Sequence, residues 1–281
     1  MRALAEFVMR GRNHAIGVAV VSGALPFLNW LGAAVAALVM LRKGPLEAMI
    51  VSMWALMPLA IAVYYIRDPS PAIALIGTAA LAYVLRTTGS WEVTFAIAVV
   101  ISAAGSLIFE LMATELLAVI VEWYMELSAD LQQAGSVSVE AARMSIMGFF
   151  AMGQAYAMLM FLILARWWQS ELYNPGGFQK EFHQLRMSPT LSGTLVALML
   201  VSFVFDEQLG RWIPLLTVPL IMMALSLVHW MMSYRKLSGH WVFGFYMLLL
   251  VLFQVIYPLL AALALIDSLF NLRARIQSKE V

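Results

Sequence analysis

The side chains best able to do chemistry in this sequence are ionisable residues that stand inside long apolar stretches. Glu110 is the clearest case, because it follows Ser106 and Phe109 close to the end of an apolar run. A charge at bilayer depth costs roughly 3 kcal/mol or more unless it faces protein or water. Glu110 is therefore predicted either to line a polar cavity or to stand as an interfacial carboxylate where its helix ends.

Further polar side chains in the apolar stretches could join Glu110 in a ligand site. His229 stands within a later apolar run, and Asp206 and Glu207 lie near the end of another. Uncharged hydrogen-bonding groups inside spans more often hold helices together than bind ligands. The candidate ligand-binding residues are Glu110, Gln154, Tyr156, His229 and Gln254.

Motifs of enzymes and metal sites are missing from the sequence. It has no Walker-type phosphate loop, no His-Glu-x-x-His helix and no Gly-x-Ser-x-Gly elbow. There is no cysteine, and the four histidines lack metal-ligand spacing. The net charge of +1 and the absence of a dense basic run argue against nucleic acid as a partner. We therefore expect no enzyme activity, no metal, no cofactor and no nucleic acid.

The elements that must position these residues belong to an integral membrane protein. Of the 281 residues, 63% are hydrophobic and 12% are charged, and the mean hydropathy is +0.87. The apolar residues come in blocks near the length that crosses a hydrocarbon core about 30 Å thick. We predict an all-α, polytopic transmembrane helix bundle that forms one membrane domain over residues 1–281 in the lipid bilayer. The blocks run at about Ala15–Leu41, Ala48–Ile66, Ala72–Leu85, Val93–Leu111, Met144–Trp168, Leu191–Phe205, Trp212–Met232 and Trp241–Phe270.

The first and last blocks are long for one span, and each contains a proline, Pro26 or Pro258. Each is predicted to be either a kinked helix or a hairpin of short helices. Because Lys and Arg are enriched in cytoplasmic loops, a hairpin in the first block places the N-terminus and the Arg166–Arg186 segment in the cytoplasm. A C-terminus on that side requires the last block to turn back as well. We expect eight to ten spans.

Two connections are longer than a turn. Residues 113–142 contain Glu115, Glu122 and Glu126 on one helical face, which predicts an amphipathic helix at the extracytoplasmic surface. Ser128–Gly135 provides a polar break, and Ser138 could cap the next helix. The amphipathic segment is either a lid or vestibule over a membrane site or an ordinary solvated face.

Residues 167–189 are predicted to be a cytoplasmic loop, with a turn at Asn174–Gly177. Its tryptophan and tyrosine residues suit the membrane interface. The loop is either an interfacial turn with aromatic anchors or a docking surface for a cytoplasmic partner. The candidate partner-docking residues are Trp168, Tyr173, Phe178, Lys180 and Arg186.

The order of these elements resembles the YybS-like family of uncharacterised bacterial membrane proteins. The resemblance rests on the acidic amphipathic stretch, a long span, the aromatic-rich loop ending in LRMSP at 185–189, and a last span closing with IDSLFNLR at 266–273. That family is regarded as distantly similar to the substrate-binding S components of energy-coupling-factor transporters. The resemblance implies a bacterial inner (cytoplasmic) membrane and a small-molecule site among the helices.

Two classes of function follow. The first is a membrane-embedded small-molecule binding or transport component that requires a separate energising partner, because the chain has no nucleotide-binding motif. The alternative is a non-transport membrane scaffold or assembly factor that recruits a cytoplasmic protein. In either case we expect the bilayer and a cytoplasmic or membrane protein as partners.

Overall fold

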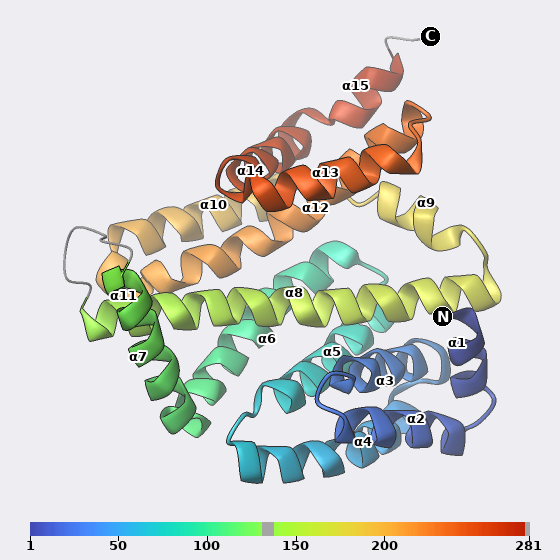
Figure 1. The fold of residues 1–281 in the computed structure, drawn as a ribbon. Helices are drawn as coiled ribbons and strands as arrows, with labels where there is room; N and C mark the ends of the chain where they lie inside the picture. Colours follow the sequence, from blue (N-terminus) through green and yellow to red (C-terminus); the bar gives the residue numbers. More distant parts are fainter. Residues whose placement is uncertain (131–137, 279–281) are drawn as a thin grey trace.

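The computed structural model describes residues 1–130 and 138–278, and the fold within these ranges consists of helices without a strand (Figure 1). The all-α prediction is confirmed. Six helical segments are long and apolar enough to cross a membrane, which makes the chain a multi-pass membrane protein. They are α4 (Pro45–Ile66), α5 (Ser70–Thr88), α6 (Trp91–Met112), α8 (Val139–Tyr173), the short η1 (Gly210–Trp212) with α12 (Ile213–Tyr234), and α14 (Phe253–Phe270).

Shorter helices run alongside these six. Two of them, α10 (Pro189–Val204) and α13 (Gly239–Val251), are apolar but have only 16 and 13 residues; counting both with the six gives eight among the described residues, the lower figure of the predicted span count. The upper figure of ten requires counting α2 (Arg12–Ala24) and α3 (Asn29–Lys43) as well. Because α2 has 13 residues, it is only about 20 Å long and does not cross a full hydrocarbon core by itself.

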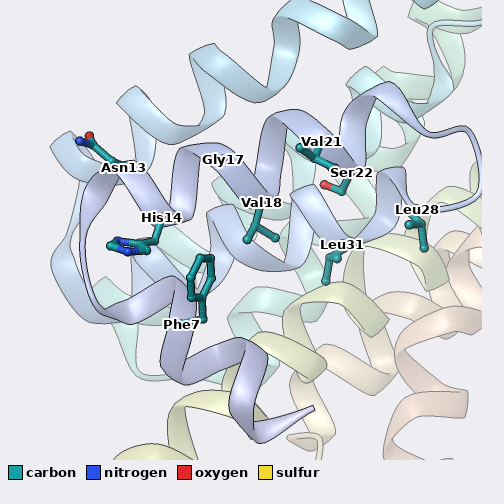
Figure 2. A pocket seen from close by; sticks show the side chains of 9 residues that line it. All are labelled: Phe7, Asn13, His14, Gly17, Val18, Val21, Ser22, Leu28 and Leu31. Carbon is teal, nitrogen blue, oxygen red and sulfur yellow. The ribbon is translucent and has the colours of Figure 1, made fainter.

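The first apolar block is a hairpin. Residues 25–28 form the turn around Pro26, and α2 and α3 pack against each other on either side of it. Figure 2 shows Ser22 of α2 and Leu31 of α3 in this hairpin. The short amphipathic α1 (Arg2–Met9) precedes the hairpin and packs on α2, α3 and α8. Of the two predicted alternatives for this block, the hairpin is therefore correct.

Helix α3 is the centre of the N-terminal half. Every residue from Gly32 to Leu41 is buried, and α2, α4, α5 and α8 surround the helix. The stretch is apolar on all sides, which is the pattern expected of a helix enclosed by other helices. Its carbonyls at Met40 and Leu41 accept hydrogen bonds from Arg86, which ties the end of α3 to the end of α5.

Helix α8 differs from its prediction because it does not end at Trp168. It runs for 35 residues, about 52 Å, and continues to Tyr173. The predicted loop 167–189 is therefore helical over its first seven residues, and α9 (Gly177–His183) follows after the turn. The turn itself lies where the sequence placed it, with Gly176 at φ +77°. The hydroxyl of Ser170 donates to the Asn174 carbonyl at 2.7 Å and accepts from the Phe178 amide at 2.8 Å, which holds α8, turn and α9 together.

The last apolar block also turns back, although not at its proline. The helices α13 and α14 are separated at Leu252, and Pro258 lies inside α14. Near its start α14 contacts the start of α12, through Tyr257 and Thr217. Beyond its end, Arg273 of α15 (Leu272–Ser278) donates to Ser226 in the second half of α12. Since α12 and α14 run in the same direction, α13 makes the return between them.

Most of the basic residues lie at one end of the bundle. One end contains the N-terminus, the α3–α4 connection, α9 and α15, and is called the basic end here (Figure 1). Among the described residues, the Lys and Arg side chains lie at or near it, apart from Arg67, Arg143 and Arg211. The opposite end contains α7 (Thr114–Asp130) and α11 (Asp206–Leu209), and is called the acidic end. This grouping is the one that alternating spans predicted.

The amphipathic helix predicted after α6 is present as α7. Glu115, Glu122 and Glu126 are exposed on it, whereas Leu117 and Val121 are buried. The buried face packs with the first turns of α8 in a small apolar cluster of its own. Ser138 caps α8 as predicted, because its hydroxyl accepts from the Ala141 amide at 3.1 Å. Of the polar break at Ser128–Gly135, residues 131–135 lie outside the described residues.

Candidate functional site

Glu110 is held between two arginines at the acidic end. Its Oε1 lies 3.2 Å from Nε of Arg143 in α8, and its Oε2 lies 3.2 Å from Nη1 of Arg211 in η1. The Glu110 side chain is 20% exposed. Glu110 matches neither prediction in full. It stands near a helix end, as an interfacial carboxylate would, but it is paired with two arginines there instead of facing water alone. We call these three residues the Glu110 cluster.

Close packing of α8 on η1 positions Arg211. A Cβ atom added to Gly148 would lie 2.4 Å from the carbonyl oxygen of Arg211, so a glycine is required where the two backbones approach. The Arg211 guanidinium also lies 4.7 Å from the centroid of the Trp212 ring, within the range of a cation–π contact. Helix α6 supplies Glu110 from its last turn. The cluster therefore joins three separate elements.

A cavity lies on each side of the first turns of α8. The first, of about 450 Å³, lies between α8 and the α11–α12 connection and is lined by Arg211 together with Glu140, Ser145 and Asp206. We call it the Arg211 cavity. The second, of about 650 Å³, lies between α7 and α8 and is called the α7 cavity. Both volumes fall in the range of roughly 300–1,000 Å³ typical of small-molecule sites.

The α7 cavity is amphipathic. Its walls are mostly apolar, with Leu117, Val121 and Met125 contributed by α7, while Arg143 lies among the lining residues from α8. Glu122 also lines it, on the exposed side of α7. The cavity thus has apolar walls, one guanidinium from Arg143, and the two carboxylates of Glu122 and Glu126.

The arginines of the Glu110 cluster have unused donors. Nε of Arg143 and Nε of Arg211 are buried and make no hydrogen bond among the described residues, although the first is at ion-pair distance from Glu110. One carboxylate thus faces two guanidiniums, which leaves one positive charge uncompensated within the cluster. Buried donors without partners are costly. An anionic group entering either cavity could satisfy them.

The other candidate ligand residues do not meet Glu110. Gln154 is buried and donates to the Ser70 carbonyl at 3.1 Å, which joins α8 to the start of α5. Gln254 is exposed on α14 and lines neither cavity. Both are polar residues in apolar helices, but the sequence does not show which way each faces.

Tyr156 and His229 each belong to a separate contact between helices. The hydroxyl of Tyr156 lies 3.0 Å from that of Tyr257, which in turn lies 2.5 Å from Oγ1 of Thr217, so that α8, α12 and α14 meet there. His229 Nε2 lies 2.9 Å from the hydroxyl of Tyr246 in α13. These pairs have the helix-joining role that is usual for polar groups inside spans.

Two of the candidate docking residues are part of the interior at the basic end. Trp168 is fully buried, because α8 continues past it and turns its side chain into the bundle. Arg186 donates from Nε to the Asp267 carbonyl at 3.0 Å and from Nη2 to the Ser268 carbonyl at 2.7 Å. It thereby caps the last turn of α14. Neither residue is free to bind a partner in this structure.

The remaining three docking candidates lie nearer the surface. Tyr173 is exposed, and the Arg42 guanidinium lies 4.0 Å from its ring centroid. Phe178 is half-buried and packs near Trp91. Lys180 is exposed. Lys180 and Arg186 line the same cavity at this end, and the docking role of the five candidates stays a prediction.

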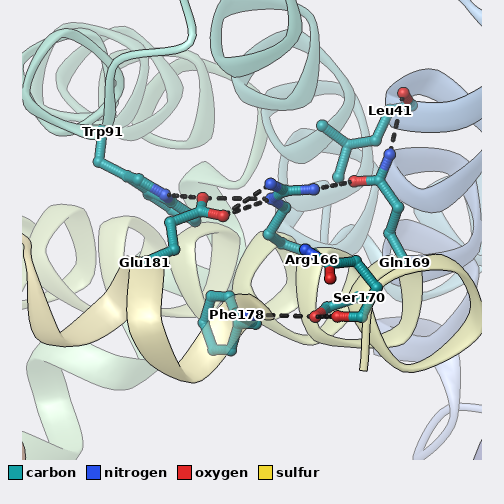
Figure 3. A network of polar contacts seen from close by, with 8 residues as sticks. Leu41, Trp91, Arg166, Gln169, Ser170, Phe178 and Glu181 are labelled. Carbon is teal, nitrogen blue, oxygen red and sulfur yellow. Dashed lines mark hydrogen bonds and ion pairs between the residues drawn. The ribbon is translucent and has the colours of Figure 1, made fainter. Parts of the chain in front are cut away.

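A polar network that sequence reasoning missed fixes α9 to the bundle (Figure 3). Arg166 binds both carboxylate oxygens of Glu181, with its Nη2 2.6 Å from Oε2. The indole Nε1 of Trp91 donates to the same carboxylate at 2.6 Å, and Gln169 links Arg166 to the carbonyl of Leu41. Because its donors and acceptors are paired with one another, we interpret this network as structural.

The described residues include no group of three or more His, Asp or Glu side chains placed to hold a metal ion. No family model, curated protein or solved structure matches the chain. The resemblance to the YybS-like family therefore stays a prediction.

Proposed function

We propose that this protein is a membrane-embedded small-molecule binding or transport component that works with a separate energising partner. The observation that supports the proposal is the Glu110 cluster, whose two arginines border two cavities at the acidic end. A cavity of about 510 Å³ also lies at the basic end, lined by Lys180 and by Trp91 and Glu181 of the polar network, but Trp91 and Glu181 are hydrogen-bonded to each other.

The shape and charge of the α7 cavity suggest the kind of molecule. The apolar walls beside Arg143 would bind the apolar part of an amphiphilic molecule, and its anionic group would replace Glu110 as the partner of Arg143. Since Glu122 and Glu126 line the same cavity and repel a second negative charge, a ligand with one anionic group fits better than a polyanion.

The energising partner is proposed because the sequence holds no phosphate-binding loop of its own. We propose further that the N-terminus and the basic end face the cytoplasm of a bacterial inner membrane, following the enrichment of Lys and Arg in cytoplasmic loops. The partner would then approach α9, and the acidic end would face away from it.

Native mass spectrometry of the purified full chain tests the proposal. A bound molecule of defined mass should accompany the wild type and be lost from Arg143→Gln, which removes the positive charge at similar volume. Glu115→Gln serves as control, because Glu115 is exposed on the same end and lies outside both cavities. The Arg143→Gln variant should keep wild-type expression, since its side chain is 41% exposed and such pairs contribute only about 0.2–1 kcal/mol.

A wild-type protein that leaves the membrane without a small molecule, but with a stoichiometric protein partner, would contradict the proposal. That result would favour the scaffold or assembly factor instead. Crosslinking before solubilisation distinguishes this partner from one acquired after lysis.

A further inference from the structure

An apolar groove follows one face of α2 at the N-terminal corner of the bundle (Figure 2). Its volume is about 490 Å³, and its lining residues come from α1, α2, the α2–α3 turn and α3. On α2, His14, Val18 and Val21 lie three to four residues apart, so they form a stripe along the helix. Gly17 leaves the groove open, since nothing lies within 4 Å of where its Cβ would be.

The groove changes from polar to apolar along its length. Asn13 and His14 stand at its basic end, in the first turn of α2, as Figure 2 shows. Val21 and Leu28 line the opposite part, toward the α2–α3 turn. Val21 is 61% exposed, so the groove is open at the side of the bundle. A molecule in it would have a polar group at the membrane surface and an apolar chain pointing toward the bilayer centre.

A cation without a described carboxylate partner lies near the polar end of the groove. Of the three arginines near the N-terminus, Arg2 pairs with Glu6 and Arg12 pairs with Glu47. Within the described part of the chain, Arg10 has no carboxylate at ion-pair distance. Its guanidinium lies 6.0 Å from the Phe7 ring centroid, and that ring meets the ring of His14 edge-on at 4.8 Å. Arg10 therefore stands beside the polar end of the groove.

We propose that this groove binds one acyl chain of an anionic phospholipid, with its phosphate at Arg10, Asn13 and His14. A phospholipid matches the site in three ways: its charge is complementary to Arg10, its polarity changes in the same direction, and the bilayer reaches the groove from the side. Helix α2 is about 20 Å long, which is shorter than the hydrocarbon core of about 30 Å. A lipid chain in the groove would fill the part of the core that α2 does not span. The site is independent of the proposed function, since the Glu110 cluster lies at the opposite end.

The test is a titration of the full chain in detergent with dioleoyl-phosphatidylglycerol or dioleoyl-phosphatidylcholine, followed by native mass spectrometry of the one-to-one complex. The wild type should bind the anionic lipid at a concentration at least tenfold lower than the zwitterionic one. Gly17→Leu adds a side chain that projects into the groove from a position where the Cβ meets nothing within 4 Å, and it should raise the required concentration of anionic lipid at least tenfold. Gly193→Leu is the matched control, because Gly193 is an exposed glycine on α10 with nothing within 4 Å of its Cβ position.

Arg10→Gln separates the headgroup from the chain. It should remove the preference for phosphatidylglycerol while leaving the binding of phosphatidylcholine unchanged. Val21→Trp blocks the groove at its open side and replaces Gly17→Leu if that variant does not insert. Unaltered lipid binding by the blocking variant would overturn the assignment of the groove. Equal binding of the two lipids by the wild type would overturn the role of Arg10.

Discussion

Replacing Gly148 by alanine tests whether the approach of α8 to η1 positions the Glu110 cluster. The added Cβ would stand 2.4 Å from the carbonyl oxygen of Arg211, whereas ordinary contact begins at 3.4 Å. The obstacle is backbone, so relief requires moving η1 by about an ångström. Overpacking of this kind costs about 1–3 kcal/mol.

Alanine also favours the helix over glycine by about 0.5–1 kcal/mol, which offsets part of that strain. We expect a net loss of up to about 2.5 kcal/mol, and an apparent Tm lowered by up to about 10 °C for a chain of this size. Displacement of Arg211 should also weaken retention of the molecule proposed for the cavities. Thermal unfolding in detergent, followed by tryptophan fluorescence, measures the first effect.

The control is Gly153→Ala in the same helix. Gly153 is exposed and has nothing within 4 Å of its Cβ position, so the substitution should be neutral or raise the Tm. If Gly148→Ala matched Gly153→Ala in stability, the close approach would not constrain η1, and the account of how Arg211 is placed would be wrong.

Three further predictions concern the basic end and the topology. Arg186→Ala should lower the unfolding free energy by about 1–3 kcal/mol, because two charge-assisted hydrogen bonds to the end of α14 are lost. The control Lys180→Ala, at an exposed position, should change it by less than about 0.5 kcal/mol. Similar losses in the two variants would refute the capping role of Arg186. Burial, and to a lesser extent the nearby Arg273, lower the pKa of His183 in the folded protein below its usual 6.5. As the pH falls, His183 is therefore protonated in the unfolded chain before it is protonated in the folded one. The stability of the fold should thus decrease as the pH drops below about 6.5. His183→Gln should reduce that slope in thermal unfolding scans at pH 5.5 and 7.5, and an unchanged slope would exclude His183 as its source. Because the chain has no cysteine, Lys180→Cys and Glu126→Cys each give a protein with a single labelling site. A membrane-impermeant maleimide should label the two variants from opposite sides of the membrane. Labelling of both variants from the same side would contradict the path of α8.

Features set by neighbouring residues could be predicted from the sequence. The Asn174–Gly177 turn and the Ser138 cap depend on residues at most a few positions apart, and both lie where the pattern placed them. The hairpin around Pro26 could be proposed as an alternative, but the choice depended on how basic segments alternate between the two ends. The continuation of α8 to Tyr173 was missed, because the polar residues after Trp168 resemble a loop until Ser170 is seen to bind the turn.

The candidate site could be predicted only in part, because it depends on contacts between distant segments. Glu110 stood out by its charge in an apolar block, whereas Arg143 and Arg211 are ordinary cations near helix starts. Arg211 is 101 residues from Glu110, and a spacing of that size has no helical or strand periodicity to signal it. Gly148 gives no signal either, since its role is visible only once η1 is placed against it.

The two ends of the bundle show how a polar residue in a membrane protein can be assigned to structure or to function. At the basic end, Arg166, Glu181 and Trp91 satisfy one another, and Arg186 is occupied by backbone carbonyls. Paired in this way, they add rigidity and leave little capacity for a ligand. In the Glu110 cluster, Nε of Arg143 and Nε of Arg211 are buried without a hydrogen bond among the described residues, and both arginines line cavities. Nε of Arg273 and Nε1 of Trp168 at the basic end are buried without one too, but neither residue lines the cavity at that end. Charge in an apolar block is therefore a weaker sign of function than charge whose bonding capacity the fold leaves unused.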